Sequence, residues 1–245
     1  MDNVGASLHK QRQIVSAIVL AGGSSQRMGP GIDKLMCRVA NRPLLAHCML
    51  AFERCPEVQE IVLVARKDRQ AGYQTLAVEQ KISKLKSVVS GGEERQDSVW
   101  SGLQALSPDS ELVLIHDGAR ALVTTDIITR CISAGRKSGA AIPASRVKDT
   151  IKRASPTPNK HGPRVETTLD RSILWSAQTP QTFRTDLIRQ AYEPLIREQI
   201  IVTDDAAAVE RIGYTVSLVE CDSLNLKITT PEDLLLAEVL LSKRA

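Results

Sequence analysis

The chain has 245 residues, of which 42% are hydrophobic and 24% charged, a balance typical of a globular protein with a sizeable core. Aromatic residues make up only 3%, so Leu, Val, Ile and Ala must build that core, which favours helices packed on a sheet. The net charge of +4 suits a small anionic substrate and is too weak and dispersed to indicate nucleic-acid binding. No apolar run approaches the ~20 residues that span a bilayer, so we expect no membrane segment.

The N-terminal stretch and the cysteines indicate a cytoplasmic protein. Residues 1–13 are polar and lack the apolar stretch of a secretory signal, so we expect a short flexible tail. The five cysteines, at 37, 48, 55, 131 and 221, form no CxxC pair and have no nearby histidine at metal spacing. Free thiols in a reducing compartment are the expected state.

From residue 14 the sequence alternates short apolar runs with longer helical stretches. Apolar, β-branched runs that predict buried strands lie at 14–20, 61–64, 85–90 and 112–115. Stretches with helical apolar spacing follow them, at 43–54, 68–80, 93–106 and 126–137. This rhythm predicts an α/β fold, with a Rossmann-like, mostly parallel sheet and helices on both faces. Ligands of such sheets bind outside the carboxyl ends of the strands, here after Leu20, Ser90 and Ile115.

The alternation breaks at residue 147. Residues 149–153 and 164–169 have the period of strands, and the turn-rich stretch 155–163 separates them. This pattern predicts a protruding β-hairpin arm over about 147–172, which would bind a partner or form a dimer. A surface insertion without a partner is the alternative. A strand at 214–219 and a helix at 231–241 complete the expected fold, and we expect residues 14–245 to form a single domain.

The loop after the first predicted strand has the features of a phosphate-binding loop. It reads LAGGSSQRMG over residues 20–29, and Lys34 follows. Small residues let backbone N–H groups approach a phosphate chain, while Arg27 and Lys34 can neutralise its charge. The loop matches neither GxxxxGK[ST] nor GxGxxG, and the latter mismatch argues against a nicotinamide-dependent dehydrogenase.

Strand, loop and lysine together resemble the triphosphate site of sugar-nucleotide and polyol-phosphate nucleotidyltransferases. Later segments narrow the resemblance to the 2-C-methyl-D-erythritol 4-phosphate cytidylyltransferases. They are GGEERQDSV at 91–99, HDGAR at 116–120, KDTIK at 148–152, LDR at 169–171, Trp175, QTPQ at 178–181, TDDA at 203–206 and NLKITTPED at 225–233. The segments occur in order between about residue 14 and residue 242, which is far more specific than any single motif.

The resemblance implies transfer of CMP from CTP to 2-C-methyl-D-erythritol 4-phosphate, with release of pyrophosphate, in the non-mevalonate isoprenoid pathway. It implies Mg²⁺ or another divalent cation, bound mainly through the CTP phosphates, with Asp117 as a possible ligand. Three charged residues are expected to be catalytic: Arg27, Lys34 and Lys227. The expected nucleotide-binding residues are Leu20, Ala21, Gly22, Gly23, Gly91, Gly92, Ser98, Asp117 and Gly118.

A second set of residues is expected to bind the polyol phosphate, namely Asp117, Arg120, Thr150, Arg171, Thr179 and Thr203. Because the family's arm crosses to a second subunit, Thr150 and Arg171 would serve the neighbour's site in a homodimer. Taken alone, each threonine is better explained by sheet packing. For Asp117, the alternative to a functional role is a carboxylate at the N-terminus of a helix, stabilised by the helix dipole.

Departures from the family pattern keep other activities open. Leu20-Ala21-Gly22-Gly23 stands where PAAG is frequent, Asp33 and Ala121 stand where proline is usual, and Gly118 replaces an alanine. Related ribitol-5-phosphate cytidylyltransferases also carry an LAGG loop, so D-ribitol 5-phosphate is the alternative acceptor. A non-catalytic nucleotide-binding protein on the same fold is the alternative of another class, although Lys34, Asp117 and Lys227 are all present.

Overall fold

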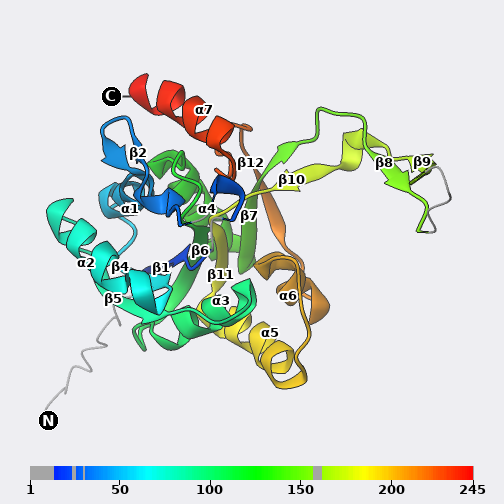
Figure 1. The fold of residues 1–245 in the computed structure, drawn as a ribbon. Helices are drawn as coiled ribbons and strands as arrows, with labels where there is room; N and C mark the ends of the chain where they lie inside the picture. Colours follow the sequence, from blue (N-terminus) through cyan, green and yellow to red (C-terminus); the bar gives the residue numbers. More distant parts are fainter. Residues whose placement is uncertain (1–13, 24–25, 30, 157–161, 245) are drawn as a thin grey trace, which may run out of the picture.

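A twisted eight-stranded sheet forms the centre of the computed structural model, which describes residues 14–23, 26–29, 31–156 and 162–244. Seven strands run in the order β10-β7-β11-β6-β1-β4-β5, and β12 pairs with β7 (Figure 1). The parallel half consists of β1 (Ile14–Ala21), β4 (Glu60–Ala65), β5 (Leu85–Ser90) and β6 (Ser110–Asp117). These are the four strands that the sequence predicts, so the mostly parallel α/β fold is confirmed.

The other half of the sheet is mixed. It contains β7 (Ala140–Arg146), β10 (Trp175–Ala177), β11 (Gln181–Arg184) and β12 (Ser217–Glu220). Strand β11 lies antiparallel between β6 and β7, while β12 is parallel to β7. The sequence predicts β12 approximately but not β7, β10 or β11, because β7 is rich in alanine and the other two are only three or four residues long.

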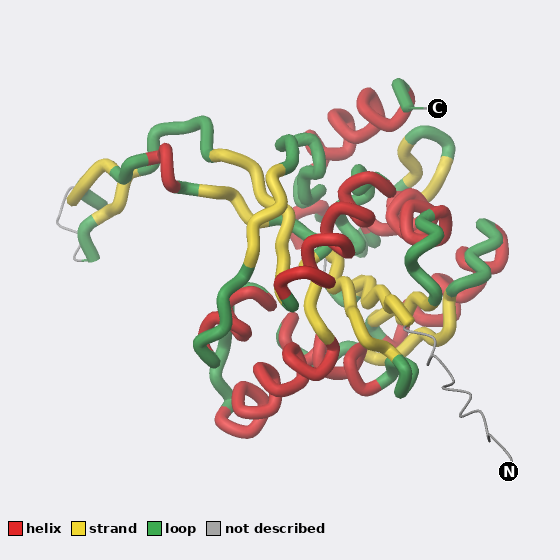
Figure 2. The backbone as a smooth tube through the Cα atoms, turned by 180° about the vertical axis from the view of Figure 1, so that it is seen from behind, coloured by secondary structure: helices red, strands yellow, loops and turns green. Residues whose placement is uncertain are grey.

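Two hydrophobic clusters, one on each face of the sheet, hold the layers together. Alternate strand residues point to opposite clusters: Leu63 and Ala65 of β4 face one, and Val62 and Val64 face the other. The first cluster is covered by α1 (Leu44–Arg54), α2 (Gln70–Glu79), α4 (Thr125–Ser138) and α7 (Pro231–Ser242). The second is covered by α3 (Arg95–Gln104), α5 (Thr185–Glu198) and α6 (Asp205–Arg211) (Figure 2).

Short elements complete the connections. A small hairpin of β2 (Arg38–Val39) and β3 (Arg42–Pro43) precedes α1. Single 3₁₀ turns are η1 (Gln26–Met28), η2 (Lys34–Met36), η3 (Lys67–Arg69) and η4 (Arg171–Ile173). In the part of the chain that the structure describes, no helix has the length and apolar character needed to cross a membrane.

The predicted arm is present and projects from the body of the molecule (Figures 1 and 2). Strands β8 (Lys152–Ala154) and β9 (Val165–Thr168) pair antiparallel in a sheet of their own. The chain then rejoins the main sheet where β10 pairs with β7. Residues 157–161 at the arm's tip and the expected tail at 1–13 lie outside the described residues, and the single-domain assignment of 14–245 stays a prediction.

Candidate active site

A cavity of about 370 Å³ opens where β1 and β6 end and where the chain passes from β5 into α3. Its wall includes Gly22 and Gly23 after β1, Lys34 of η2, Arg95 and Ser98 of α3, Asp117 at the end of β6, and Lys227 before α7. Leu20 and Gly92 also line it. Residues more than 200 positions apart in the sequence therefore meet at the carboxyl edge of the parallel strands, where α/β sheets bind ligands.

Cations gather on one side of this cavity. The Lys34 ammonium donates a hydrogen bond to the Ile228 carbonyl oxygen at 2.9 Å, which ties η2 to the segment that carries Lys227. Burial lowers the pKa of Lys34, and the nearby charges of Lys227 and Arg27 lower it further. The three predicted catalytic cations thus lie within electrostatic reach of one another, although Arg27 itself is exposed and does not line the cavity.

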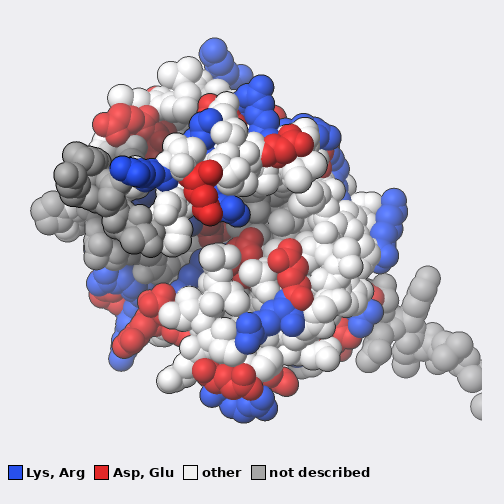
Figure 3. Space-filling model, turned by 90° about the vertical axis from the view of Figure 1, so that its right-hand side faces the viewer, with Lys and Arg blue, Asp and Glu red and all other residues white. Residues whose placement is uncertain are grey.

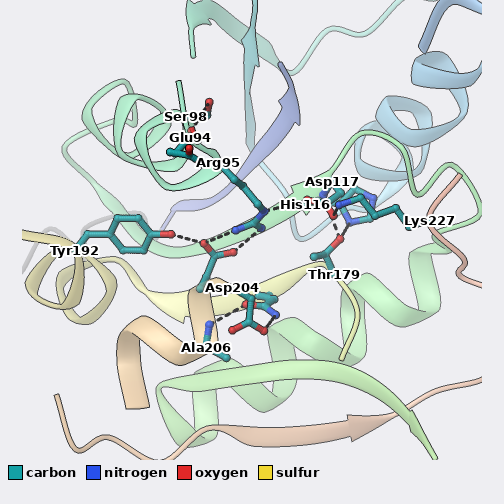
Figure 4. A network of polar contacts seen from close by, with 12 residues as sticks. Glu94, Arg95, Ser98, His116, Asp117, Thr179, Tyr192, Asp204, Ala206 and Lys227 are labelled. Carbon is teal, nitrogen blue, oxygen red and sulfur yellow. Dashed lines mark hydrogen bonds and ion pairs between the residues drawn. The ribbon is translucent and has the colours of Figure 1, made fainter. Parts of the chain in front are cut away.

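Asp117 is the central carboxylate of the site (Figure 4). One of its oxygen atoms lies 2.8 Å from the Lys227 ammonium, and the other lies 3.3 Å from Nε of Arg95. Burial alone would raise the pKa of Asp117, but the charges of Arg95 and Lys227 outweigh it and hold that pKa well below its usual range. Asp117 is therefore ionised at neutral pH and holds the Lys227 side chain in place.

Arg95 is a site residue to which the sequence analysis gives no role. Its guanidinium donates two hydrogen bonds to the fully buried Asp205, at 3.0 and 2.8 Å, in addition to its contact with Asp117. The Tyr192 hydroxyl donates to the same Asp205 carboxylate at 2.5 Å. Arg95 and Asp205 both stand in the motifs quoted above, GGEER and TDDA, but only the fold brings these distant segments together (Figure 4).

The glycine-rich turn after β5 lies beside Ser98. The Ser98 hydroxyl accepts a hydrogen bond from the Gly92 N–H at 3.2 Å and donates one to the Glu94 carbonyl oxygen at 3.3 Å. A Cβ atom at Gly91 would lie 2.6 Å from the Ser98 Oγ atom, so a side chain there would displace the serine. Glycine at this position therefore lets the turn lie closely against Ser98 at the cavity wall.

A second layer of polar residues supports Asp117 from behind. The Thr179 hydroxyl accepts a hydrogen bond from the Asp117 N–H at 3.1 Å and lies 3.0 Å from Nδ1 of His116. Nε2 of His116 must donate to the Arg120 carbonyl oxygen, at 3.2 Å, because that oxygen can only accept. Burial lowers the pKa of His116 to about 4, so its ring is neutral at pH 7 and Nδ1 accepts the Thr179 proton. Arg120 donates to the Asn225 carbonyl oxygen at 2.7 Å.

The remaining predicted residues are distributed as follows. Thr179 and Arg120 lie behind the cavity wall rather than on it. Ala21, Gly91 and Gly118 flank wall residues, and the Gly118 N–H donates to the Leu20 carbonyl oxygen at 2.9 Å. Thr150 and Arg171 are exposed on the arm, and Thr203 is exposed before α6; none of the three lines the cavity of its own subunit.

The donor set fits a resident divalent cation poorly. Among the described residues, no three His, Cys, Asp or Glu side chains are grouped as a metal site would require. Each oxygen atom of Asp117 already contacts a cation, which makes this carboxylate less available to a metal ion.

The surface beside the arm carries charges of both signs. On the side of the molecule that bears the arm, Lys and Arg side chains are interspersed with Asp and Glu (Figure 3). The converging cations at the sheet edge are thus suited to an anionic small molecule that enters the cavity.

Fold and site together define a nucleotidyltransferase: an α/β sheet whose carboxyl edge combines a glycine-rich loop, converging cations and the ionised carboxylate of Asp117. The chain belongs to the 2-C-methyl-D-erythritol 4-phosphate cytidylyltransferase family, whose model matches residues 15–243.

Relatives and solved structures agree with this assignment. The chain is 46% identical to the 2-C-methyl-D-erythritol 4-phosphate cytidylyltransferase of Geobacillus kaustophilus, over 93% of this chain and 97% of the relative. It is 44% identical to the enzyme of that name from Dehalococcoides mccartyi, over 94% and 96%. The crystal structure of 4-diphosphocytidyl-2C-methyl-D-erythritol synthase from Anaerococcus prevotii matches with a TM-score of 0.80 and 33% identity, over 94% of this chain and 96% of that one. These matches do not favour the ribitol-phosphate or non-catalytic alternatives.

Proposed function

We propose that this enzyme transfers CMP from CTP to 2-C-methyl-D-erythritol 4-phosphate, giving 4-diphosphocytidyl-2-C-methyl-D-erythritol and pyrophosphate, a step of the non-mevalonate isoprenoid pathway. The main support for the proposal is that Lys34, Lys227 and the glycine-rich loop line the same cavity in a chain of this family. Such a site can hold two mutually repelling phosphate groups close together.

The chemistry needs positioning and charge stabilisation rather than a protein nucleophile. A phosphate oxygen of the polyol phosphate attacks the α-phosphorus of CTP in line, a new P–O bond forms, and the bond to the β-phosphate oxygen breaks as pyrophosphate leaves. The attacking phosphate monoester is already deprotonated at neutral pH, so no general base is required. Lys34, Lys227 and Arg27 would stabilise the charge that develops on the phosphate oxygens in the transition state.

Each part of the cavity has a proposed ligand group. Gly22 and Gly23 would offer backbone N–H groups to the triphosphate, and the turn at Gly91 and Gly92 with Ser98 would select cytosine. Asp117 would orient Lys227 and accept hydrogen bonds from ribose or substrate hydroxyls. Thr179 and Arg120 would act through Asp117 and the 225–228 segment, since both are bonded behind the wall.

Mg²⁺ is proposed to arrive as part of the substrate, bound to the phosphates of CTP. Bound there, it would neutralise phosphate charge. The protein's own positive charge at the phosphates would come from Lys34, Lys227 and Arg27.

The arm is proposed to complete the site of a second subunit in a homodimer. Thr150 and Arg171 are exposed and lie outside their own cavity, and large apolar side chains on and beside the arm, Val165 and Ile173, are 63% and 74% exposed. Covering these side chains would favour association. Light scattering at micromolar concentration would test this, and a monomer would contradict it.

A cytoplasmic location is also proposed. All five cysteines are free in the structure, and three of them are buried, as expected of a protein kept in a reducing compartment.

Pyrophosphate release tests the reaction itself. The protein would be incubated with CTP and Mg²⁺ and with either 2-C-methyl-D-erythritol 4-phosphate or D-ribitol 5-phosphate. We expect release with the methylerythritol phosphate. Release with ribitol 5-phosphate alone would overturn the proposed acceptor, and no release with either would favour a binding protein.

A further inference from the structure

The structure has a second cavity, of about 520 Å³. It is lined by residues of the β2–β3 hairpin, helix α1, the segment that leads into α4, and the end of α7. Helix α1 contributes His47, Leu50, Ala51 and Arg54, whose spacing of three and four residues places them on one helix face. The two cavities share no lining residue.

The wall of this cavity is cationic. Arg42, Arg54 and Arg244 all line it, and no aspartate or glutamate does. Arg42 donates to the Gln80 amide oxygen at 3.3 Å and Arg244 to the Leu122 carbonyl oxygen at 2.8 Å, so both contact neutral acceptors. None of the three arginines makes an ion pair within the described part of the chain.

Two carboxylates beside lining residues are already engaged. Glu238 accepts a hydrogen bond from the Ala40 N–H at 2.6 Å and another from the Ser242 hydroxyl at 3.4 Å. Asp126, in the first turn of α4, pairs with Arg130 at 3.5 Å. Neither lines the cavity, so they offset its positive charge only in part.

One further feature makes the cavity attractive to an anion. The 14-residue helix α4 begins at this wall with Thr125, and its positive dipole end adds to the arginine charges.

An apolar surface lies beside the charged groups. Leu50, Ala51, Val123 and Leu241 line the same cavity, and its volume is within the range of small-molecule sites. The wall thus combines guanidinium groups, which match the geometry of phosphate oxygens, with room for a short hydrocarbon part.

We propose that this second cavity binds a phosphorylated small molecule, whose dianionic phosphate contacts Arg42, Arg54 and Arg244 and whose apolar portion lies against Leu50 and Leu241. The inference does not depend on the proposed reaction, because none of these residues belongs to the active-site cavity.

Isothermal titration calorimetry with phenyl phosphate tests the proposal on the full chain. We expect binding by the unaltered protein and affinity about tenfold weaker or worse in the Arg42→Gln/Arg54→Gln variant, because two charge-assisted contacts are lost. The matched control is Arg197→Gln/Arg211→Gln, which removes the same charge from α5 and α6, across the sheet. Thermal unfolding would verify that both variants are folded.

Two further measurements distinguish binding at this cavity from binding at the active site, and the effect of its charged groups from that of its apolar wall. Lys34→Ala, which removes an active-site cation, should leave phenyl phosphate binding at the second cavity intact. Inorganic phosphate should bind more weakly than phenyl phosphate. The proposal is overturned if the unaltered protein does not bind phenyl phosphate, if R42Q/R54Q binds as the control does, or if Lys34→Ala alone abolishes binding. Equal affinity for phenyl phosphate and inorganic phosphate would show that Leu50 and Leu241 do not contact the ligand.

Discussion

The carboxyl edge of the sheet and the arm present their polar residues in opposite ways. At the edge, Asp117 is held by Arg95 and Lys227, and Arg95 is held in turn by the buried Asp205. On the arm, Thr150 and Arg171 are exposed, and the two-stranded sheet of β8 and β9 packs on no second layer in the described chain. A two-stranded hairpin of this kind is only marginally stable alone.

This difference indicates which residues can work within one subunit. The edge is organised by its own fold, since Asp117, Arg95 and Lys227 hold one another in place. The arm needs a surface to lie against before its residues can be positioned. We therefore expect edge variants to lose turnover outright, and arm variants to lose function in a way that a second subunit can repair.

The largest effect is expected at the edge. Lys227→Ala and Lys34→Ala should each lower kcat by about 10²–10³, as expected for removing a preorganised charge from the transition state. Lys137→Ala, an exposed lysine on α4, is the control and should turn over normally. Steady-state pyrophosphate release measures this, and near-normal kcat in both edge variants would reject their proposed role.

The arm should give a smaller loss that can be repaired in trans. Arg171→Ala is expected to reduce kcat/KM for the polyol phosphate by about tenfold or more, with KM for CTP unchanged. Mixed after joint refolding, Lys34→Ala and Arg171→Ala subunits should recover about a quarter of the normal activity, because half the dimers are mixed and each has one intact site. No recovery in a mixture shown to contain mixed dimers would place Arg171 in its own subunit's site.

His116 links the edge to stability in acid. Its pKa is about 4 in the folded protein against 6.5 in the unfolded chain, so the unfolded state takes up its proton first. The contribution of the neutral His116 ring to the free energy of unfolding is therefore complete above about pH 6.5 and declines as the pH falls toward 4. Between about pH 7.5 and 5, the free energy of unfolding should fall by about 2 kcal/mol more than in a His116→Gln variant. Urea unfolding at the two pH values measures this, and equal losses would contradict the buried neutral ring.

The smallest effect is expected at Asp33, which precedes Lys34. One of its oxygen atoms accepts from the Leu35 N–H at 3.1 Å and the other from the buried Tyr73 hydroxyl at 2.8 Å, so it fixes the turn that presents Lys34. Asp33→Ala should raise KM for CTP by about three- to tenfold, and Asp33→Asn, which can still accept the Leu35 hydrogen bond, should raise it less. Equal KM values in all three proteins would show that Lys34 does not need this anchor.

The sequence alone predicts the parallel half of the sheet well, because strands such as 61–64 are buried on both faces and bounded by clear helical periods. It does not predict β7 or β11, since Ala140–Arg146 lacks a β-branched pattern and Gln181–Arg184 is a strand only because β6 and β7 flank it. At the site, the resemblance of the motifs to one family predicts that Lys34, Asp117 and Lys227 act together. The sequence does not predict the role of Arg95, because its partner Asp205 lies 110 residues away and only the folded chain brings the two together.

A crystal structure with bound CTP would show whether the cations at the sheet edge bind the triphosphate. We expect phosphate oxygens within hydrogen-bond distance of the Lys34 and Lys227 ammonium groups, with the cytosine against Gly91, Gly92 and Ser98. A nucleotide whose phosphates lie away from Arg27, Lys34 and Lys227 alike, in the second cavity or elsewhere, would contradict this expectation.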